Sequence, residues 1–175
     1  GPAYLTIKNI LNIGVFLIFL QANSWLKKPD SILKRGEFFM LTTLTLIGMY
    51  LMISSGNFLL FYIGLETASF PIAALVAFNK YKKESAEAGA KYIFNAIFSS
   101  AIMTFGLSFL YGACGTLYYT DIAANIYSTP LVVMAMVFVM SGLFFKISLV
   151  PFHLWAPDTY QGAPTNVTLY LSTIS

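Results

Sequence analysis

Long apolar runs alternate with short polar segments along this chain. Five of the runs are long enough to cross a bilayer as α-helices, because a crossing takes about 20 apolar residues. A sixth run opens near the C-terminal end and is too short to cross, so we expect the natural protein to continue beyond it. The predicted spans are residues 5–26, 38–54, 58–78, 86–111 and 131–156, followed by the incomplete stretch 163–175.

Composition identifies the solvent around these helices. Residues of the AVILMFWYC set make up 58% of the chain and charged residues 10%, whereas about 25% of a typical soluble domain is charged. This is too little charge to cover a surface that faces water, so lipid must be the outer solvent. The sequence therefore predicts an all-α integral membrane protein, a polytopic transmembrane helix bundle, with residues 1–175 forming a single membrane domain.

Basic residues are concentrated in two alternate loops between the predicted spans. They are Lys27, Lys28, Lys34 and Arg35 in the first loop and Lys80, Lys82 and Lys83 in the third. Cytoplasmic loops of membrane proteins accumulate Lys and Arg, so we expect these loops to face the cytoplasm or the matrix. Because the net charge of +3 comes from short loops, nucleic acid is not an expected partner.

The chain has few residues for metal, redox or hydrolytic chemistry. Cys114 is its single cysteine and His153 its single histidine, so a disulfide framework and a Cys/His metal cluster are excluded. The sequence also contains no glycine-rich nucleotide loop, Walker motif or Ser/His/Asp arrangement. We therefore expect no cofactor in this chain.

Glu66 is an acidic residue near the middle of a predicted span. Eight residues of the span 58–78 precede it and twelve follow it. A charged acid at that depth costs on the order of 2.5–3.5 kcal/mol, and such residues usually face a bundle interior or a polar path. The alternatives are a protonated acid hydrogen-bonded between helices and a group that handles protons. Pro71, five residues later, cannot donate to the carbonyl group of Thr67, which predicts a kink beside the acid.

Lys146 lies in the span 131–156, with apolar neighbours on both sides. A lysine that snorkels to the interface is the ordinary explanation, but such a lysine is expected at the end of a span. Pro151 follows five residues later and predicts a discontinuous helix, a feature that transporters place next to a cavity. We therefore favour a functional role for Lys146.

Lys91 and His153 each have two possible explanations. Lys91 is close enough to the start of its span to snorkel, but the small residues of the run 85–90 allow close helix approach and favour a position facing protein. His153 titrates near neutral pH and could relay protons, or it could form an interfacial hydrogen bond. Asp158, in the turn that follows, is interpreted as a helix cap.

These charges suggest how the chain could move protons. Opposite charges about 4 Å apart attract by about 4 kcal/mol at an effective dielectric constant of 20. Forming or breaking a contact between Glu66 and a lysine would therefore change the proton affinity of that lysine. The sequence does not identify which lysine meets Glu66.

One long segment carries a family signature. Residues 145–172 read FKISLVPFHLWAPDTYQGAPTNVTLYLS, which resembles the antiporter-like, proton-conducting membrane subunits. In that family a lysine, a broken helix, a histidine and a Pro-Asp-x-Tyr-x-Gly-Ala-Pro turn occur in the same order. Residues 57–71 and 87–116 are similar to the branch found in bacterial NADH-quinone oxidoreductase, respiratory complex I. Together these similarities cover nearly everything after Gly36.

The resemblance implies an architecture and a set of roles. The family has fourteen helices built from two inverted five-helix repeats, and this fragment would run from the third helix to the start of the eighth. Glu66 corresponds to the acid of the fifth helix, Lys91 to the lysine of the sixth and Lys146 to that of the broken seventh. His153 matches a histidine of the proton relay. A further lysine of the eighth helix is expected at or just after residue 175.

The resemblance also implies a function in proton translocation, coupled to electron transfer from NADH to quinone. NADH, FMN, iron–sulfur clusters and quinone would lie in partner subunits, and neighbouring antiporter-like subunits would be the main protein partners. The expected location is the bacterial cytoplasmic (inner) membrane. Two alternatives stay open: a subunit of a cation/proton antiporter, and a scaffold subunit of the same fold that conducts nothing.

Overall fold

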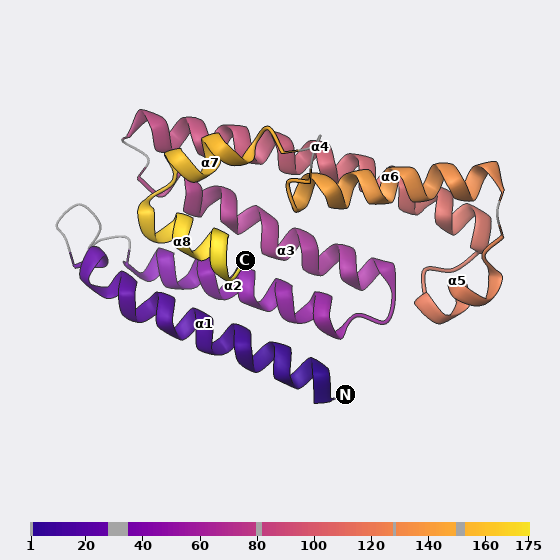
Figure 1. Cartoon of the computed structure of the whole chain (residues 1–175), viewed down its shortest axis with the longest axis horizontal. Coiled ribbons are helices and arrows are strands. Elements are labelled where there is room, and N and C mark those ends of the chain that lie inside the picture. Colours follow the sequence, from indigo (N-terminus) through magenta and orange to yellow (C-terminus); the bar gives the residue numbers. More distant parts are fainter. Residues whose placement is uncertain (1, 28–34, 80–81, 128, 150–152) are drawn as a thin grey trace.

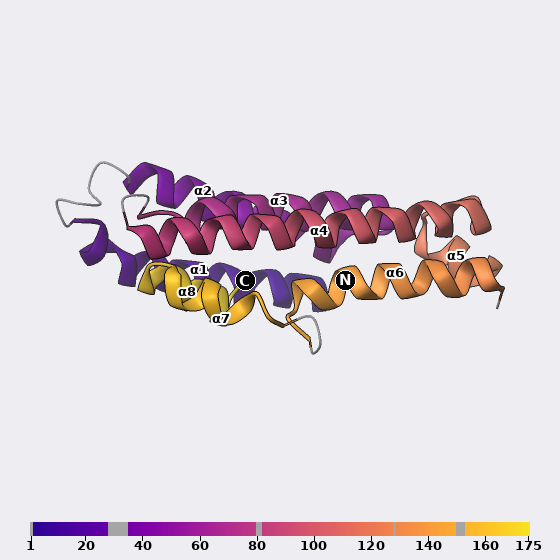
Figure 2. The ribbon, with the colours of Figure 1, turned by 90° about the horizontal axis from the view of Figure 1, so that it is seen from above.

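The chain forms a bundle of α-helices in two layers, as the computed structural model shows in Figures 1 and 2. The structure describes residues 2–27, 35–79, 82–127, 129–149 and 153–175. Within these residues the helices are α1 Pro2–Leu26, α2 Arg35–Ser54, α3 Phe58–Val76, α4 Lys83–Cys114, α5 Tyr119–Asn125, α6 Pro130–Lys146, α7 Ala156–Gly162 and α8 Thr165–Thr173. In the view from above, α2, α3 and α4 form one layer, and α1, α6, α7 and α8 form the other (Figure 2).

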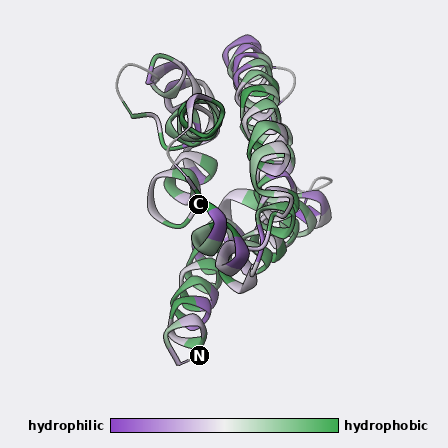
Figure 3. Ribbon diagram, turned by 90° about the vertical axis from the view of Figure 1, so that its right-hand side faces the viewer, coloured by the Kyte–Doolittle hydropathy of each residue, from purple (hydrophilic) through white to green (hydrophobic). Residues whose placement is uncertain are grey.

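Large apolar side chains lie on the outside of the bundle as well as in its interior. Phe94 and Leu154, for example, are 73% and 77% exposed, and hydrophobic residues recur along all the long helices in Figure 3. A helix that is hydrophobic on all sides is typical of a membrane span. Among the described residues, α1, α2, α3 and α4 are long and apolar enough to cross a bilayer, and α6 is a shorter apolar helix. The predicted all-α membrane fold is confirmed.

The first four helices begin and end within three residues of the predicted spans 5–26, 38–54, 58–78 and 86–111. α3 continues through Pro71 to Val76. The short helix α5 was not predicted, because a seven-residue polar helix carries no hydropathy signal. It follows a short segment that pairs with the turn between α2 and α3, where the Phe58 N–H donates to the Leu117 oxygen at 2.9 Å.

Local sequence explains several helix ends. Asn57 caps α3 by accepting a hydrogen bond from the Leu60 N–H at 2.7 Å, as expected of an N-cap residue. Thr129 caps α6 in the same way, and Pro130 occupies its first turn, where a missing N–H costs nothing. Gly115 ends α4 with φ 70°, the left-handed conformation that glycine adopts without strain.

α6 ends at Lys146, well before residue 156, where the predicted span ends. The predicted discontinuous helix is confirmed. We expected the interruption at Pro151, which lies outside the described residues, whereas the helix stops upstream of it. Ser148 has φ 51°, and a non-glycine residue in this left-handed conformation cannot continue a right-handed helix. The break therefore begins immediately after Lys146.

Trp155 bridges this break. Its indole Nε1–H donates to the carbonyl oxygen of Phe145 at 2.7 Å, in the last turn of α6, and the Ser148 N–H donates to the same oxygen at 3.3 Å. The same indole packs edge to face against Tyr92 of α4, with ring centroids 5.6 Å apart. The two sides of the break are thus joined to each other and to α4.

Glycines let neighbouring helices approach closely. A Cβ added to Gly64 of α3 would lie 2.8 Å from the Gly48 oxygen and 2.8 Å from the Met52 nitrogen of α2. Gly106 and Gly142 have the same effect between α4 and α6. Small residues at such positions are the usual basis of helix association in membranes. These contacts fix α2 against α3 and α4 against α6.

The helix ends next to the predicted basic loops lie together. Figure 1 shows the C-terminal ends of α1 and α3 and the N-terminal ends of α2 and α4 at one end of the bundle. Lys27, Arg35, Lys82 and Lys83 belong to or adjoin these ends. We refer to this end of the bundle, defined by these four residues, as the basic end.

Substituting Gly64 tests the close approach of α2 and α3. Gly64→Ala should destabilise the protein by about 1–3 kcal/mol, because the new methyl group meets backbone atoms that cannot rotate away. Gly112→Ala is the matched control, since nothing lies within 4 Å of a Cβ at that position and alanine favours a helix. Heat-induced aggregation of the detergent-solubilised protein should begin at a lower temperature for Gly64→Ala only. Equal temperatures for the two variants would contradict the packing.

Substituting Trp155 tests the bridge across the break. Trp155→Phe keeps an aromatic ring against Tyr92 but removes the indole hydrogen bond to the Phe145 carbonyl, so amide hydrogen exchange at Ile147 and Leu149 should accelerate by about tenfold. Trp25→Phe makes the same change in a different aromatic cluster, against Phe38, and should leave these amides unchanged. Unchanged exchange at Ile147 and Leu149 in Trp155→Phe would show that the indole does not stabilise the break.

Candidate functional site

Glu66 lies in α3, half-buried at the contact with α4. The hydroxyl group of Ser100 in α4 donates a hydrogen bond to Glu66 Oε1, and Ser100 is only 6% exposed. A buried carboxyl group is stable only when its oxygens have partners. Ser100 was not singled out by the sequence, because a serine in a predicted span gives no local signal of what it contacts.

A short series of hydroxyl groups continues from this contact. Thr104, one turn after Ser100, donates to the Ser100 backbone oxygen at 2.8 Å and lies 2.9 Å from the Tyr62 hydroxyl. Tyr62 is itself one turn before Glu66 on α3. Glu66 is therefore at one end of a polar strip between α3 and α4, which runs away from the basic end of the bundle.

Lys146 is the last residue of α6, on the other side of α4. One turn earlier, Gly142 brings α6 close to α4: a Cβ there would lie 2.9 Å from the Ser99 oxygen. The Lys146 Nζ atom is buried and has no hydrogen-bond partner in the described part of the chain. It adjoins a small cavity lined by Tyr92, Asn95, Ala96, Ser99, Phe145, Lys146 and Trp155.

The structure brings Glu66 and Lys146 near each other without direct contact. The Glu66 carboxyl group lies within electrostatic range of Lys146, but the described residues contain no ion pair between them within 4 Å. α4 separates them with two consecutive serines, since Ser99 lines the Lys146 cavity and Ser100 contacts Glu66. A small movement of α3 or α6 against α4 would change the distance between acid and amine.

Lys91 is not a partner of Glu66 in this structure. Its Nζ lies 3.1 Å from Glu87 and 2.9 Å from Asp158, in two ion pairs. It precedes Ser100 by nine residues on α4, which at 1.5 Å per residue places the two about 13 Å apart along the helix axis. The small residues near Lys91 do allow close approach, because a Cβ on Gly89 would lie 2.5 Å from the Ala77 Cβ. These small residues pack against α3, whereas the Lys91 side chain is exposed and contacts α7.

The interpretation of Asp158 as a helix cap was wrong. The N-cap position of α7 is Trp155, without a side-chain cap bond, and Asp158 lies in the first turn. Its carboxylate pairs with Lys91 instead. This contact joins residues 67 positions apart in sequence, so no local pattern could have revealed it.

His153 lies between the break and α7. The side chain is half-buried, and its Nδ1 atom is buried and has no hydrogen-bond partner among the described residues. Its backbone oxygen accepts a hydrogen bond from the Ala156 N–H at 3.1 Å. An imidazole can both donate and accept a proton near neutral pH, so His153 has the chemistry of a relay.

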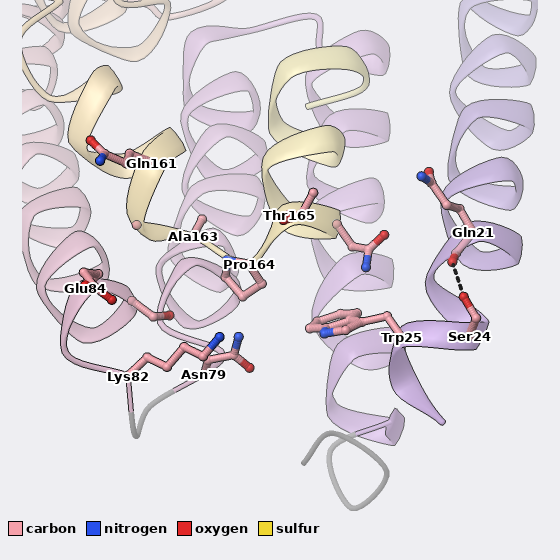
Figure 4. Close-up of a pocket in the computed structure, with 13 residues that line it drawn as sticks. Gln21, Ser24, Trp25, Asn79, Lys82, Glu84, Gln161, Ala163, Pro164 and Thr165 are labelled. Carbon is pink, nitrogen blue, oxygen red and sulfur yellow. Dashed lines mark hydrogen bonds between the residues drawn. The ribbon is translucent and has the colours of Figure 1, made fainter. Parts of the chain in front are cut away.

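A larger polar groove opens at the basic end of the bundle, and sequence reasoning missed it. Its volume is about 630 Å³, and Figure 4 shows Trp25 on one side, Asn79 and Lys82 below, and Gln161 with the α7–α8 turn above. None of the predicted site residues lines it. Lys82 and Glu84, at the start of α4, are among the charged residues that line it.

The groups of the candidate site can be compared with those that bind metals and those that bind protons. Among the described residues there is no cluster of three or more His, Cys, Asp and Glu side chains that could hold a metal ion. An acid with a hydroxyl donor, a buried amine without a partner and a histidine are all groups that can bind and release protons.

Comparison with known proteins gives a consistent result. Residues 55–175 match the family described as NADH:quinone oxidoreductase/Mrp antiporter, TM. The chain is 60% identical to NADH-quinone oxidoreductase subunit N of Phocaeicola vulgatus over 174 residues, which cover 99% of this chain and 37% of that protein. It is 41% identical to subunit N of Desulforamulus reducens over 163 residues, or 91% of this chain and 34% of that one.

Two solved structures share this fold. A chain of respiratory complex I from Thermus thermophilus, solved with bound aureothin, has a TM-score of 0.79 and 30% identity, over 96% of this chain and 37% of its own length. A chain of the membrane-bound sulfane sulfur reductase, an archaeal respiratory membrane complex, has a TM-score of 0.82 and 28% identity, over 97% and 34%. The chain thus spans about a third of the length of the proteins it matches. It belongs to the NADH:quinone oxidoreductase/Mrp antiporter family of membrane subunits.

Proposed function

We propose that this chain is part of a proton-translocating membrane subunit of NADH-quinone oxidoreductase. Protons would pass through Glu66, Lys91, Lys146 and His153, driven by electron transfer from NADH to quinone in other subunits. The similar bacterial proteins are both named NADH-quinone oxidoreductase subunit N, and this supports the redox-driven complex over a cation/proton antiporter.

The observation that carries the proposal is the amine of Lys146. It is buried at the end of a broken helix and lacks a hydrogen-bond partner in the described part of the chain. An unpaired buried amine is costly, and an ionisable residue inside a membrane is by default a candidate for ion or proton transport. A structural lysine would be expected to have a partner or to reach the interface.

The separation of Lys146 from Glu66 suggests a mechanism. At an effective dielectric constant of 20, a contact of about 4 Å between them would be worth about 4 kcal/mol. Making and breaking this contact would change how tightly Lys146 holds its proton. The adjoining cavity, through Asn95 and Ser99, provides polar groups next to the amine for a proton to move to or from.

The remaining two residues extend the path toward the basic end of the bundle. His153 follows the break after Lys146, with Nδ1 available for a proton. Lys91 lies further toward the basic end, paired with Glu87 and Asp158. We propose that the basic end faces the cytoplasm and that protons enter from this side.

The apolar helices and the family membership place the chain in the bacterial inner membrane as a multi-pass protein. In the proposed complex its partners are other membrane subunits, especially neighbouring antiporter-like subunits, and the lipid bilayer. NADH, FMN, the iron–sulfur clusters and quinone would bind to partner subunits.

Removing the amine of Lys146 tests the proposal. In the intact complex, Lys146→Met should lower proton pumping by about tenfold or more, because a proton-transfer group is lost. Lys8→Met is the matched control: Lys8 is also a helical lysine, but its amine contacts Ser54 at 2.5 Å and lies over the Tyr50 ring. Pumping is measured in inverted membrane vesicles with a pH-sensitive dye and divided by NADH oxidation. Wild-type pumping in Lys146→Met would overturn the proposal.

Copurification distinguishes the redox complex from an antiporter. If the full-length subunit is tagged and isolated gently from its native membrane, flavin and iron–sulfur absorbance should copurify with it. An assembly that contains neither would favour the cation/proton antiporter.

A further inference from the structure

α7 is attached to the first turns of α4 by three different contacts. Gly162 is packed so closely that an added Cβ would lie 2.5 Å from the Ala88 Cβ and 2.6 Å from the Glu84 oxygen. Trp155, at the start of α7, packs edge to face against Tyr92. Between them, Asp158 pairs with Lys91 at 2.9 Å. The three contacts lie in order along one face of each helix.

Two of these residues also form the wall of the cavity beside Lys146. Tyr92 and Trp155 line the cavity together with Asn95 and Ser99 of α4. Trp155 precedes Asp158 by three residues, which is about one helical turn. The place where Asp158 of α7 docks on α4 therefore affects the position of Trp155. The size and closure of the cavity follow from that position.

The geometry points to Asp158 as a positioning residue for Lys146. We propose that its ion pair with Lys91 keeps α7 docked on α4 and thereby keeps Trp155 closed over the cavity. Asp158 would act through Lys91 and Trp155, without touching the transferred proton. Its importance for pumping rests on the proposed function, whereas its effect on the cavity does not.

Lys91 is suited to this contact because it is already held from its own helix. Glu87, one turn earlier on α4, pairs with Lys91 at 3.1 Å. The order that Glu87 imposes reduces the entropy lost when Asp158 binds the same amine. Glu87 and Asp158 differ in one respect: only Asp158 connects α4 to α7.

That difference supplies the control for an accessibility experiment. Ser99 lines the cavity and is fully buried, so Ser99→Cys places a reporter thiol inside it. The complete complex carrying this reporter is treated with N-ethylmaleimide in inverted membrane vesicles, and labelling of the subunit is measured over time. Added Asp158→Asn should increase the labelling rate by about two- to fivefold, as expected for the loss of a half-exposed ion pair. Added Glu87→Gln should leave the rate unchanged.

Two further variants separate docking from general damage. Asp158→Glu keeps the charge and should retain the rate of the reporter background. The exchange Lys91→Asp with Asp158→Lys reverses the pair and should restore slow labelling relative to Asp158→Asn. The inference is overturned if Asp158→Asn labels at the background rate, if Glu87→Gln accelerates labelling equally, or if the exchanged pair labels as fast as Asp158→Asn.

Pumping measurements distinguish this inference from the proposed function. If labelling responds as expected but Lys146→Met pumps normally, docking by Asp158 stands and the role of Lys146 in proton transfer fails. If Lys146→Met abolishes pumping but Asp158→Asn does not change labelling, the proton path stands and the positioning role fails.

Discussion

A helix that stops inside a bilayer must find partners for its last carbonyl groups other than water. α6 stops at Lys146, and the rest of the site depends on how this requirement is met. The indole of Trp155 reaches back across the break to the Phe145 carbonyl, and the Leu149 N–H bonds to the Phe144 oxygen at 3.0 Å. The carboxyl end of a helix also favours a positive charge, which suits the Lys146 ammonium. The break is therefore a stable structure with an amine at its edge.

The small residues of α4 allow the neighbouring helices and the two charged groups to lie close to the break. The glycines and serines of α4 allow α3, α6 and α7 to approach closely, as at Gly89 and Gly106. The same small residues leave room for polar contacts at adjacent positions, so Ser99 and Ser100 serve the amine and the acid separately. Close packing and the placement of the two charges thus both depend on small side chains of α4.

The sequence predicts those parts of this arrangement that depend on local properties. Glu66 and Lys146 stand out because a charge in an apolar run is visible without knowledge of the fold, and Pro151 indicated that the helix near Lys146 is discontinuous. The exact end of α6, at Lys146, could not be predicted, since the left-handed conformation of Ser148 is not one that serine favours. The pairing of Lys91 with Asp158 depends on a tertiary contact and could not be predicted from spacing.

The partners of Glu66 and Lys91 also suggest different uses for these two residues. Glu66 is bonded to a serine hydroxyl, which can donate to a carboxylate or accept from a carboxylic acid by rotating its hydrogen. The contact therefore survives whether Glu66 holds a proton or not. Lys91, in contrast, is held between two carboxylates, and its pairing with both depends on its charge. An acid that keeps its partner in either protonation state is suited to proton transfer. A lysine held by two acids also fixes one helix against another, in addition to any place it has in the proton path.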